Sequence, residues 1–225
     1  MDNYFYTKRI DEVIQRIEDA RREVSEHHIV KLVAVSKYSE VQEVHSLYEA
    51  GQRAYGENKV QDLKVKSDAL NALPLEWHFL GRLQKNKINQ LIEASPTLFQ
   101  SLDSYELAVA LNLRLVAKDT TMNALLQINS SGEESKQGIE PENAIELYKK
   151  IQNELPNIRL KGVMTIGAHS ENKDEIKKSF DKTYEIFNRL KANGAKICSM
   201  GMSSDFELAI KCGSNMIRLG SVLFK

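Results

Sequence analysis

Short apolar runs alternate with amphipathic stretches along almost the whole chain, and this alternation limits the possible folds more than any other feature. Eight runs are typical of buried strands, and a stretch with helical spacing separates each run from the next. The expected strands are 29–35, 53–58, 75–81, 97–102, 124–129, 159–166, 195–201 and 215–220. Strict alternation of strand and helix predicts a parallel sheet, which is either closed into a barrel or open and doubly wound.

The number of strands and the two ends of the chain favour an α/β fold of the (β/α)8 TIM-barrel type. Ile10, Val13 and Ile17 recur at helical spacing before the first strand, which predicts an N-terminal helix there. We expect this helix to cover the last strand, because too few residues follow that strand to form a long helix. No linker interrupts the pattern, so residues 1–225 are predicted to form a single domain.

Two of the intervening helices have recognisable start signals. Ser39-x-x-Gln42 and Ser204-x-x-Glu207 both match the capping-box pattern, in which a hydroxyl residue and a later Gln or Glu satisfy the first helical amides. The helices are therefore expected to begin near Ser39 and at Ser204.

The composition argues against several classes of protein. The chain has 31 basic and 31 acidic residues, so bulk charge does not favour binding to nucleic acid or to a membrane surface. No apolar run approaches the roughly 20 residues that a membrane span needs, and the charged N-terminus lacks the apolar core of a secretory signal. Cys198 and Cys212 form no disulfide framework, and the histidines show no metal-ligand spacing. We expect a cytoplasmic protein without a metal site.

Two neighbouring strand ends have features of an anion-binding site. In a parallel barrel the carboxyl ends of the strands form the functional face. Residues 201–205, Gly-Met-Ser-Ser-Asp, place a glycine and hydroxyls before a helix whose first amides lack partners. Gly220 and Ser221 follow the last strand and offer close backbone approach and another hydroxyl. Either motif alone is more often a simple cap or turn, but together they favour a phosphate.

Lys37 follows the first strand on the same face, where it is either a surface residue or an amine placed for chemistry. An amine at a partly desolvated site has a lowered pKa and can attack an aldehyde. Across from a phosphate site, it fits pyridoxal 5′-phosphate or a phosphorylated sugar in a class I aldolase. Arg218, expected to point inward, would keep a pyridine nitrogen unprotonated, so such a site would hold the cofactor but support little carbanion chemistry.

Blocks of sequence from Leu32 to the C-terminus carry a family resemblance. They are AVSKYSE, AGQRAYGENKVQD, EWHFLGRLQKNK, SLDS, INSSGEESKQG, GVMTIG, SMGMSSDFELAI and IRLGSVLF. As a set and in this order, they resemble the signature blocks of the pyridoxal phosphate homeostasis proteins, which are single-domain relatives of the barrel domain of bacterial alanine racemase. Lys59 stands where the family has a tyrosine, and we expect it to point to solvent without functional effect.

The resemblance implies pyridoxal 5′-phosphate as the cofactor and identifies the residues that would contact it. Those residues are Lys37, Asn58, Ser203, Arg218, Gly220 and Ser221. The lysine would carry the cofactor as a Schiff base, the serines and the glycine would contact its phosphate, and the arginine would face its pyridine ring. The asparagine would also face the cofactor. No residue is assigned a catalytic role.

The resemblance implies a carrier that holds the cofactor and regulates its free level, with apo-enzymes as candidate recipients and a monomer as the expected state. The alternative is a racemase-like enzyme acting on amino acids. Racemases of that type take a second base, a tyrosine, from a separate C-terminal domain, which we do not expect here; Tyr38 is an internal candidate. The class I aldolase has no support from the flanking blocks.

Three further features are given structural interpretations. His78 is expected to be a hydrogen-bonded core residue, and Glu57 a partner for a loop amide. The charged segment 130–138 is expected to be a loop on the functional face that is hydrophilic rather than functional.

Overall fold

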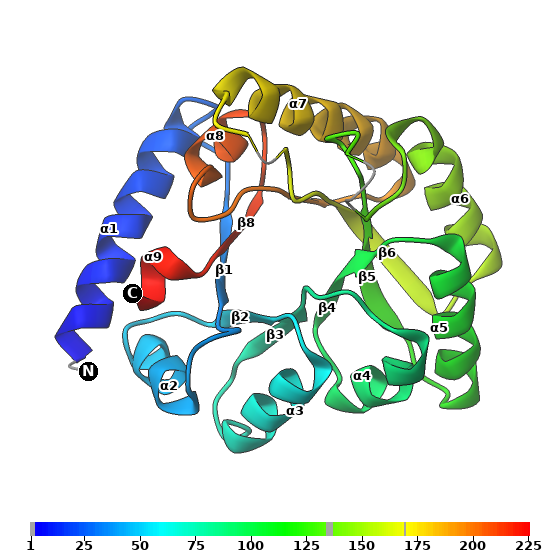
Figure 1. Ribbon diagram of the computed structural model, residues 1–225, viewed down its shortest axis with the longest axis horizontal. Coiled ribbons are helices and arrows are strands. Elements are labelled where there is room, and N and C mark those ends of the chain that lie inside the picture. The colour runs from blue at the N-terminus through cyan, green and yellow to red at the C-terminus, as the bar shows by residue number, and fades with distance from the viewer. Residues whose placement is uncertain (1–2, 134–136, 169) are drawn as a thin grey trace.

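The eight strands close into a parallel barrel in chain order, which confirms the predicted (β/α)8 fold (Figure 1). The computed structural model describes residues 3–133, 137–168 and 170–225. Each strand is parallel to its neighbours, and pairing of the last strand with the first completes the ring. The strands are β1 (Lys31–Val35), β2 (Ala54–Glu57), β3 (Glu76–Phe79), β4 (Leu98–Leu102), β5 (Met122–Gln127), β6 (Ile158–Met164), β7 (Ile197–Ser199) and β8 (Met216–Leu219).

Helices surround the barrel. They are α1 (Asn3–Arg22), α2 (Val41–Glu49), α3 (Val60–Ala69), α4 (Ile88–Ala94), α5 (Tyr105–Ala117), α6 (Ala144–Glu154), α7 (Lys173–Leu190), α8 (Phe206–Lys211) and α9 (Ser221–Phe224). The N-terminal helix α1 contacts α2, α8 and α9, so it completes the ring beside the last strand as expected (Figure 1). Within the described ranges, every helix is too short or too polar to cross a membrane.

The two predicted helix starts are displaced toward acidic residues. The N-cap of α2 is Glu40, whose backbone amide donates to the carboxylate of Glu43 at 2.8 Å. Ser39 instead belongs to the preceding turn, because its amide donates to the carbonyl of Ser36. The N-cap of α8 is Asp205 rather than Ser204, and its carboxylate accepts a bond from the amide of Met202 at 2.6 Å. The helix predicted near Ser39 is therefore present with Glu40 as its N-cap, and the start predicted at Ser204 is displaced by one residue.

An apolar cluster joins side chains from six of the strands inside the barrel. Its members are Val33, Ala54, Leu98, Leu125, Met164 and Met216. Gly162 in β6 allows the sheet to close here, because a Cβ at this position would lie 1.8 Å from the carbonyl oxygen of Ile197 in β7. Its φ of 150° is also one that residues with a side chain rarely adopt.

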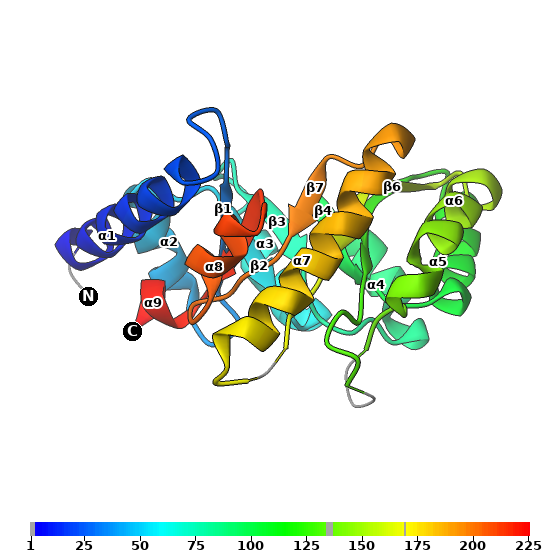
Figure 2. The same ribbon diagram turned by 90° about the horizontal axis from the view of Figure 1, so that it is seen from above.

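All carboxyl strand ends lie on one face of the ring, because the strands are parallel. Figure 2 shows the barrel edge-on. The carboxyl face is on the lower side of this view, where α9 and the N-terminal end of α7 lie. The loop that precedes β1 lies at the opposite edge. Side chains that follow different strands can therefore meet only on the lower side of this view.

Candidate functional site

A cavity of about 770 Å³ opens on the carboxyl face beside the ends of β1, β2 and β8 and the loop after β7. All six residues predicted from the sequence line it: Lys37, Asn58, Ser203, Arg218, Gly220 and Ser221. These positions span almost the whole chain, and only closure of the ring between β8 and β1 brings them together.

Lys37 continues the inward-facing series that Val33 and Val35 begin on β1, because alternate residues of a strand face the same side. Its side chain is exposed in the cavity mouth, and its Nζ lies 5.0 Å from the centroid of the Tyr38 ring. Among the residues that the structure describes, none forms a hydrogen bond or an ion pair with this Nζ. The expectation of a partly desolvated amine is wrong, since the strand ends here and leaves the side chain of Lys37 in solvent. Among the described residues, the amine contacts the Tyr38 ring but has no competing hydrogen bond or ion pair.

A buried ion pair anchors the backbone just before Lys37. Nζ of Lys66, on α3, donates to the carbonyl oxygen of Ser36 at 2.6 Å and to the carboxylate of Glu57 at 2.7 Å. The hydroxyl of Ser36 donates to the same carboxylate oxygen at 2.6 Å. Glu57 is fully buried and Lys66 is 7% exposed. The peptide that leads into Lys37 is therefore held by a salt bridge beneath the helix layer.

This arrangement corrects the interpretation of Glu57 as a partner for a loop amide. Its partners are an ammonium and a hydroxyl, and within the described residues its second carboxylate oxygen has no hydrogen bond. Lys66 was not identified from the sequence. A lysine in the amphipathic segment of α3 resembles a surface residue, and no local pattern indicates that it reaches β1 and β2.

Ser203 and Ser221 form the hydroxyl edge of the cavity. The amide of Gly220 donates to Oγ of Ser203 at 3.2 Å, so this hydroxyl keeps its own proton to donate to a ligand. Ser221 is exposed and is the first residue of α9, one residue after the end of β8. The adjacent helices α8 and α9 have only six and four residues. The hydroxyls, rather than a long helix dipole, are thus the polar groups offered to an anion.

Arg218 is a buried cation in the cavity wall. It is 5% exposed, and its two terminal nitrogens donate to Oγ of Ser199 at 2.6 Å and to the carbonyl of Thr165 at 2.7 Å. Burial lowers the pKa of Arg218 to about 10, which leaves the guanidinium charged at neutral pH. No described carboxylate forms an ion pair with it. The side chain therefore presents a fixed positive charge at the cavity.

Asn58 is exposed at the end of β2, and its position depends on Gly81. A Cβ at Gly81 would lie 1.9 Å from the backbone carbonyl oxygen of Asn58. Any larger residue would force the two loops apart. Gly81 was noted in the sequence only as a strand end, and its role is to allow this close approach.

His78 lies inside the barrel and not in the cavity, as expected for a core residue. It is fully buried, and its ring nitrogens are 2.8 Å from the carboxylate of Glu76 and 2.7 Å from the amide nitrogen of Gln100.

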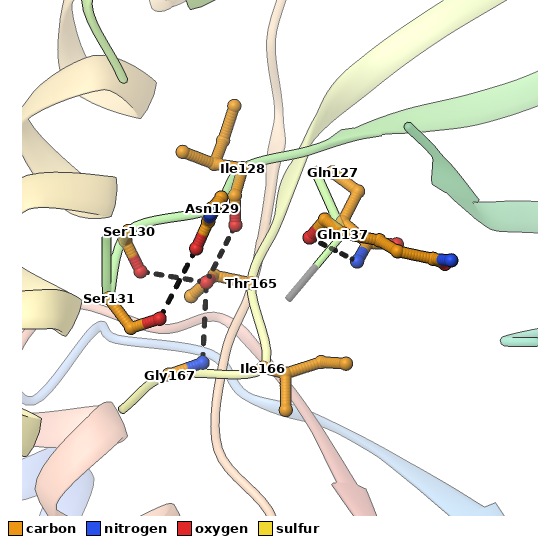
Figure 3. Close-up of a pocket in the computed structure, with 9 residues that line it drawn as sticks. All are labelled: Gln127, Ile128, Asn129, Ser130, Ser131, Gln137, Thr165, Ile166 and Gly167. Carbon is orange, nitrogen blue, oxygen red and sulfur yellow. Dashed lines mark hydrogen bonds between the residues drawn. The ribbon is translucent and has the colours of Figure 1, made fainter. Parts of the chain in front are cut away.

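A smaller pocket of about 240 Å³ lies next to the main cavity on the same face, between the ends of β5 and β6 (Figure 3). Ile166 lines both. The polar groups of the smaller pocket bond to one another: Oγ of Ser130 is 2.8 Å from Oγ1 of Thr165, which donates to the carbonyl of Ile128. Residues 134–136, within the predicted loop 130–138, lie outside the described residues.

Three comparisons place these observations among known proteins. The family described as alanine racemase, N-terminal domain, matches residues 9–225. A relative from Helicobacter pylori named pyridoxal phosphate homeostasis protein is 51% identical over 220 residues, which are 98% of each chain. The structure of PipY from Synechococcus elongatus with PLP bound is 28% identical, with a TM-score of 0.83, and the match covers 98% of this chain and all of that one.

A more distant likeness concerns the fold alone. Alanine racemase from Clostridium difficile is 19% identical with a TM-score of 0.74, and the match covers 93% of this chain but 55% of the racemase. The barrel is thus shared with that enzyme. The near full-length match to the homeostasis proteins is closer in sequence. The chain belongs to the family of pyridoxal phosphate homeostasis proteins, whose barrel has the fold of the alanine racemase N-terminal domain.

Proposed function

We propose that this protein binds pyridoxal 5′-phosphate in the main cavity and acts in homeostasis of that cofactor, as a carrier rather than as an enzyme. The observation that carries the proposal is the meeting of three groups in one cavity: an amine without a hydrogen bond or ion pair to any described residue, a hydroxyl edge and a buried guanidinium. The name of the Helicobacter pylori relative and the PLP-bound structure of PipY support the same assignment.

The chemistry of the cavity fits the cofactor group by group. The hydroxyls of Ser203 and Ser221 would donate to the phosphate, and Gly220 would let the backbone approach it. Nζ of Lys37 would form a covalent bond to the aldehyde carbon, with loss of one water molecule. Arg218 would meet the pyridine nitrogen. A dianion, an aldehyde and a ring acceptor thus each have a matching group.

The presence of Arg218 favours binding of the cofactor rather than catalysis on a substrate. When bound, pyridoxal phosphate can supply an electron sink, and it does so best when its ring nitrogen is protonated or paired with a carboxylate. A guanidinium cannot accept a proton from the ring, and its positive charge opposes a second positive charge beside it. Glu43 is a carboxylate that also lines the cavity. It already accepts a bond from the amide of Glu40 at the start of α2, so it is not offered to the ring nitrogen.

We further propose that residues 1–225 act as a single cofactor-binding domain and as a monomer in the cytoplasm, with apo-enzymes as recipients. A closed barrel leaves no open sheet edge for pairing with another chain. Both cysteines are free and buried, which suits a reducing compartment. Light scattering after size-exclusion chromatography tests the state of assembly, with the mass of one chain as the expected result.

The test of cofactor binding is retention of pyridoxal phosphate after desalting, read by visible absorption. We expect the wild-type protein to retain about one cofactor per chain and Lys37→Ala to lose the absorption band. Lys59→Ala is the matched control, because Lys59 is an exposed lysine that adjoins Asn58 without lining the cavity. A wild-type protein that retains no cofactor, or a Lys37→Ala variant that behaves like wild type, would contradict the proposal.

The same preparation separates a carrier from a racemase. The loaded protein is incubated with L-alanine, and D-alanine is measured by chiral chromatography. A carrier gives conversion far below ordinary enzyme rates, which are about 1 per second or faster. Conversion at such rates, lost in Tyr38→Phe, would instead identify a racemase-like enzyme that uses Tyr38 as its base.

A further inference from the structure

A chain of hydrogen bonds crosses the barrel interior from the cavity to the opposite face. Arg218 donates to Oγ of Ser199 at 2.6 Å, and Ser199 donates to Oε1 of Gln100 at 2.7 Å. Nε2 of Gln100 lies 2.7 Å from Nδ1 of His78, and Nε2 of His78 lies 2.8 Å from the carboxylate of Glu76. Four strands contribute these five residues: Arg218 is on β8, Ser199 on β7, Gln100 on β4, and His78 and Glu76 are both on β3.

The groups at the two ends of this series of hydrogen bonds, the guanidinium and the carboxylate, fix the direction of every bond between them. A guanidinium only donates, so Ser199 accepts from Arg218 and its own proton goes to the Gln100 carbonyl. The Gln100 nitrogen must then donate to Nδ1 of His78. A carboxylate only accepts, so His78 carries its proton on Nε2 and donates it to Glu76. All donors therefore point from the cation at the cavity toward the anion at the amino face.

The links are buried, which makes each of them costly to leave unmade. His78, Gln100 and Ser199 are fully buried, and Glu76 reaches solvent at the amino face, where Lys31 contacts it at 2.6 Å. Bonds that polarise one another in the same direction strengthen each other in a low-dielectric interior. Asp205 acts on Arg218 through space without a hydrogen bond between them, whereas this series of hydrogen bonds links the guanidinium to the carboxylate of Glu76 by direct contacts.

We propose that Ser199, Gln100 and His78 are positioning residues that hold the Arg218 guanidinium against the place where the ring of the ligand lies. The chain keeps the cation turned into the barrel wall and away from the hydroxyl edge where the phosphate would bind. The cavity thereby selects a ligand whose ring presents an acceptor nitrogen opposite its anionic group. This inference rests on the proposed function for the identity of that ligand.

The first test needs no cofactor and no variant. Nitrogen-15 NMR of the wild-type protein reports which ring nitrogen of His78 carries the proton. We expect a proton on Nε2 and none on Nδ1. A proton on Nδ1, alone or together with one on Nε2, would reverse or break the chain and would overturn the proposal.

The second test measures the link nearest to Arg218. Ser199→Ala is expected to speed hydrogen exchange of the Arg218 guanidinium and to raise the Kd for pyridoxal phosphate by about tenfold, as loss of a bond to a charged group predicts. Ser199→Thr keeps the hydroxyl and is expected to restore both values. Ser46→Ala is the matched control, because it removes a buried hydroxyl whose bond among the described residues is to the carbonyl of Gln42 in the same segment.

The outcomes distinguish this inference from the proposed function. If the wild-type protein binds no pyridoxal phosphate, the proposed function fails, while the His78 tautomer and the Arg218 exchange rates still test the chain. If the wild-type protein binds and Ser199→Ala matches it in both affinity and exchange, the inference fails. A Ser199→Thr variant as defective as Ser199→Ala would also contradict it, since the hydroxyl would not then be the group that matters.

Discussion

Removal of the ammonium of Lys66 is the sharpest perturbation available near Lys37. The pair of Lys66 and Glu57 is buried, with side-chain exposures of 9% and 0%, and its N–O distance is 2.7 Å. In Lys66→Met the buried carboxylate keeps only the hydroxyl of Ser36 as a partner, and the Ser36 carbonyl loses one of its donors. Removing one partner of a buried pair costs about 3–5 kcal/mol. This is a large fraction of the roughly 5–15 kcal/mol that stabilises a typical domain.

The assay is urea unfolding followed by circular dichroism, with matched controls. Lys64→Met removes the cation of an exposed pair with Asp68 on the same helix, and we expect a change of at most about 0.5 kcal/mol. The double variant Glu57→Leu/Lys66→Met leaves no buried charge at this position and is expected to recover most of the lost stability. It still lacks the bond to Ser36, so its affinity for pyridoxal phosphate should stay below that of the wild type.

The result that would refute this reasoning is a Lys66→Met variant as stable as Lys64→Met. The ammonium would then contribute no more than a surface charge, and the ion pair could not be what fixes the backbone before Lys37. A double variant that binds the cofactor as tightly as wild type would refute the anchoring argument while leaving the stability argument intact.

Two further predictions concern acid stability and loop packing. The hydrogen bond from His78, aided by Lys31, lowers the pKa of Glu76 to about 2. The ionised Glu76 therefore stabilises the folded state above the unfolded pKa near 4.5, and this stabilisation is lost as the pH falls toward 2. At about 1.4 kcal/mol per pKa unit, this sets an upper limit of about 3 kcal/mol, which solvent screening of the partly exposed carboxylate reduces, and urea unfolding of wild type and Glu76→Gln should converge near pH 2. Gly81→Ala places a methyl group against the carbonyl of Asn58; we expect a lower melting temperature by calorimetry and a raised Kd for pyridoxal phosphate, and unchanged values would contradict the assigned clash.

The fold was predictable because its signal is repeated eight times along the chain. Each apolar run followed by an amphipathic stretch is a local pattern, and the number of repeats then selects the closed ring. The N-caps lie one residue after Ser39 and Ser204. Neighbouring carboxylates determine this, because Glu43 accepts from the amide of Glu40 and Asp205 accepts from the amide of Met202. A capping motif identifies a short segment well, but it does not choose between adjacent polar residues.

The six cavity residues were predictable because each follows a strand end or belongs to a recognisable block. The groups that support them were not. Ser199 and Gln100 meet across 99 positions of sequence, and Lys66 reaches Ser36 across 30. Such contacts depend on the closed barrel and leave no local pattern. The exposure of Lys37 was also missed, because solvation at a strand end depends on how the following loop lies.

The measurement that tests the central claim most directly is mass mapping of the cofactor attachment site. The protein is mixed with pyridoxal phosphate, reduced with borohydride, digested and sequenced by tandem mass spectrometry. We predict one adduct, on Nζ of Lys37, with the exposed Lys59 unmodified in the same sample. An adduct spread over surface lysines, or none on Lys37, would contradict the account.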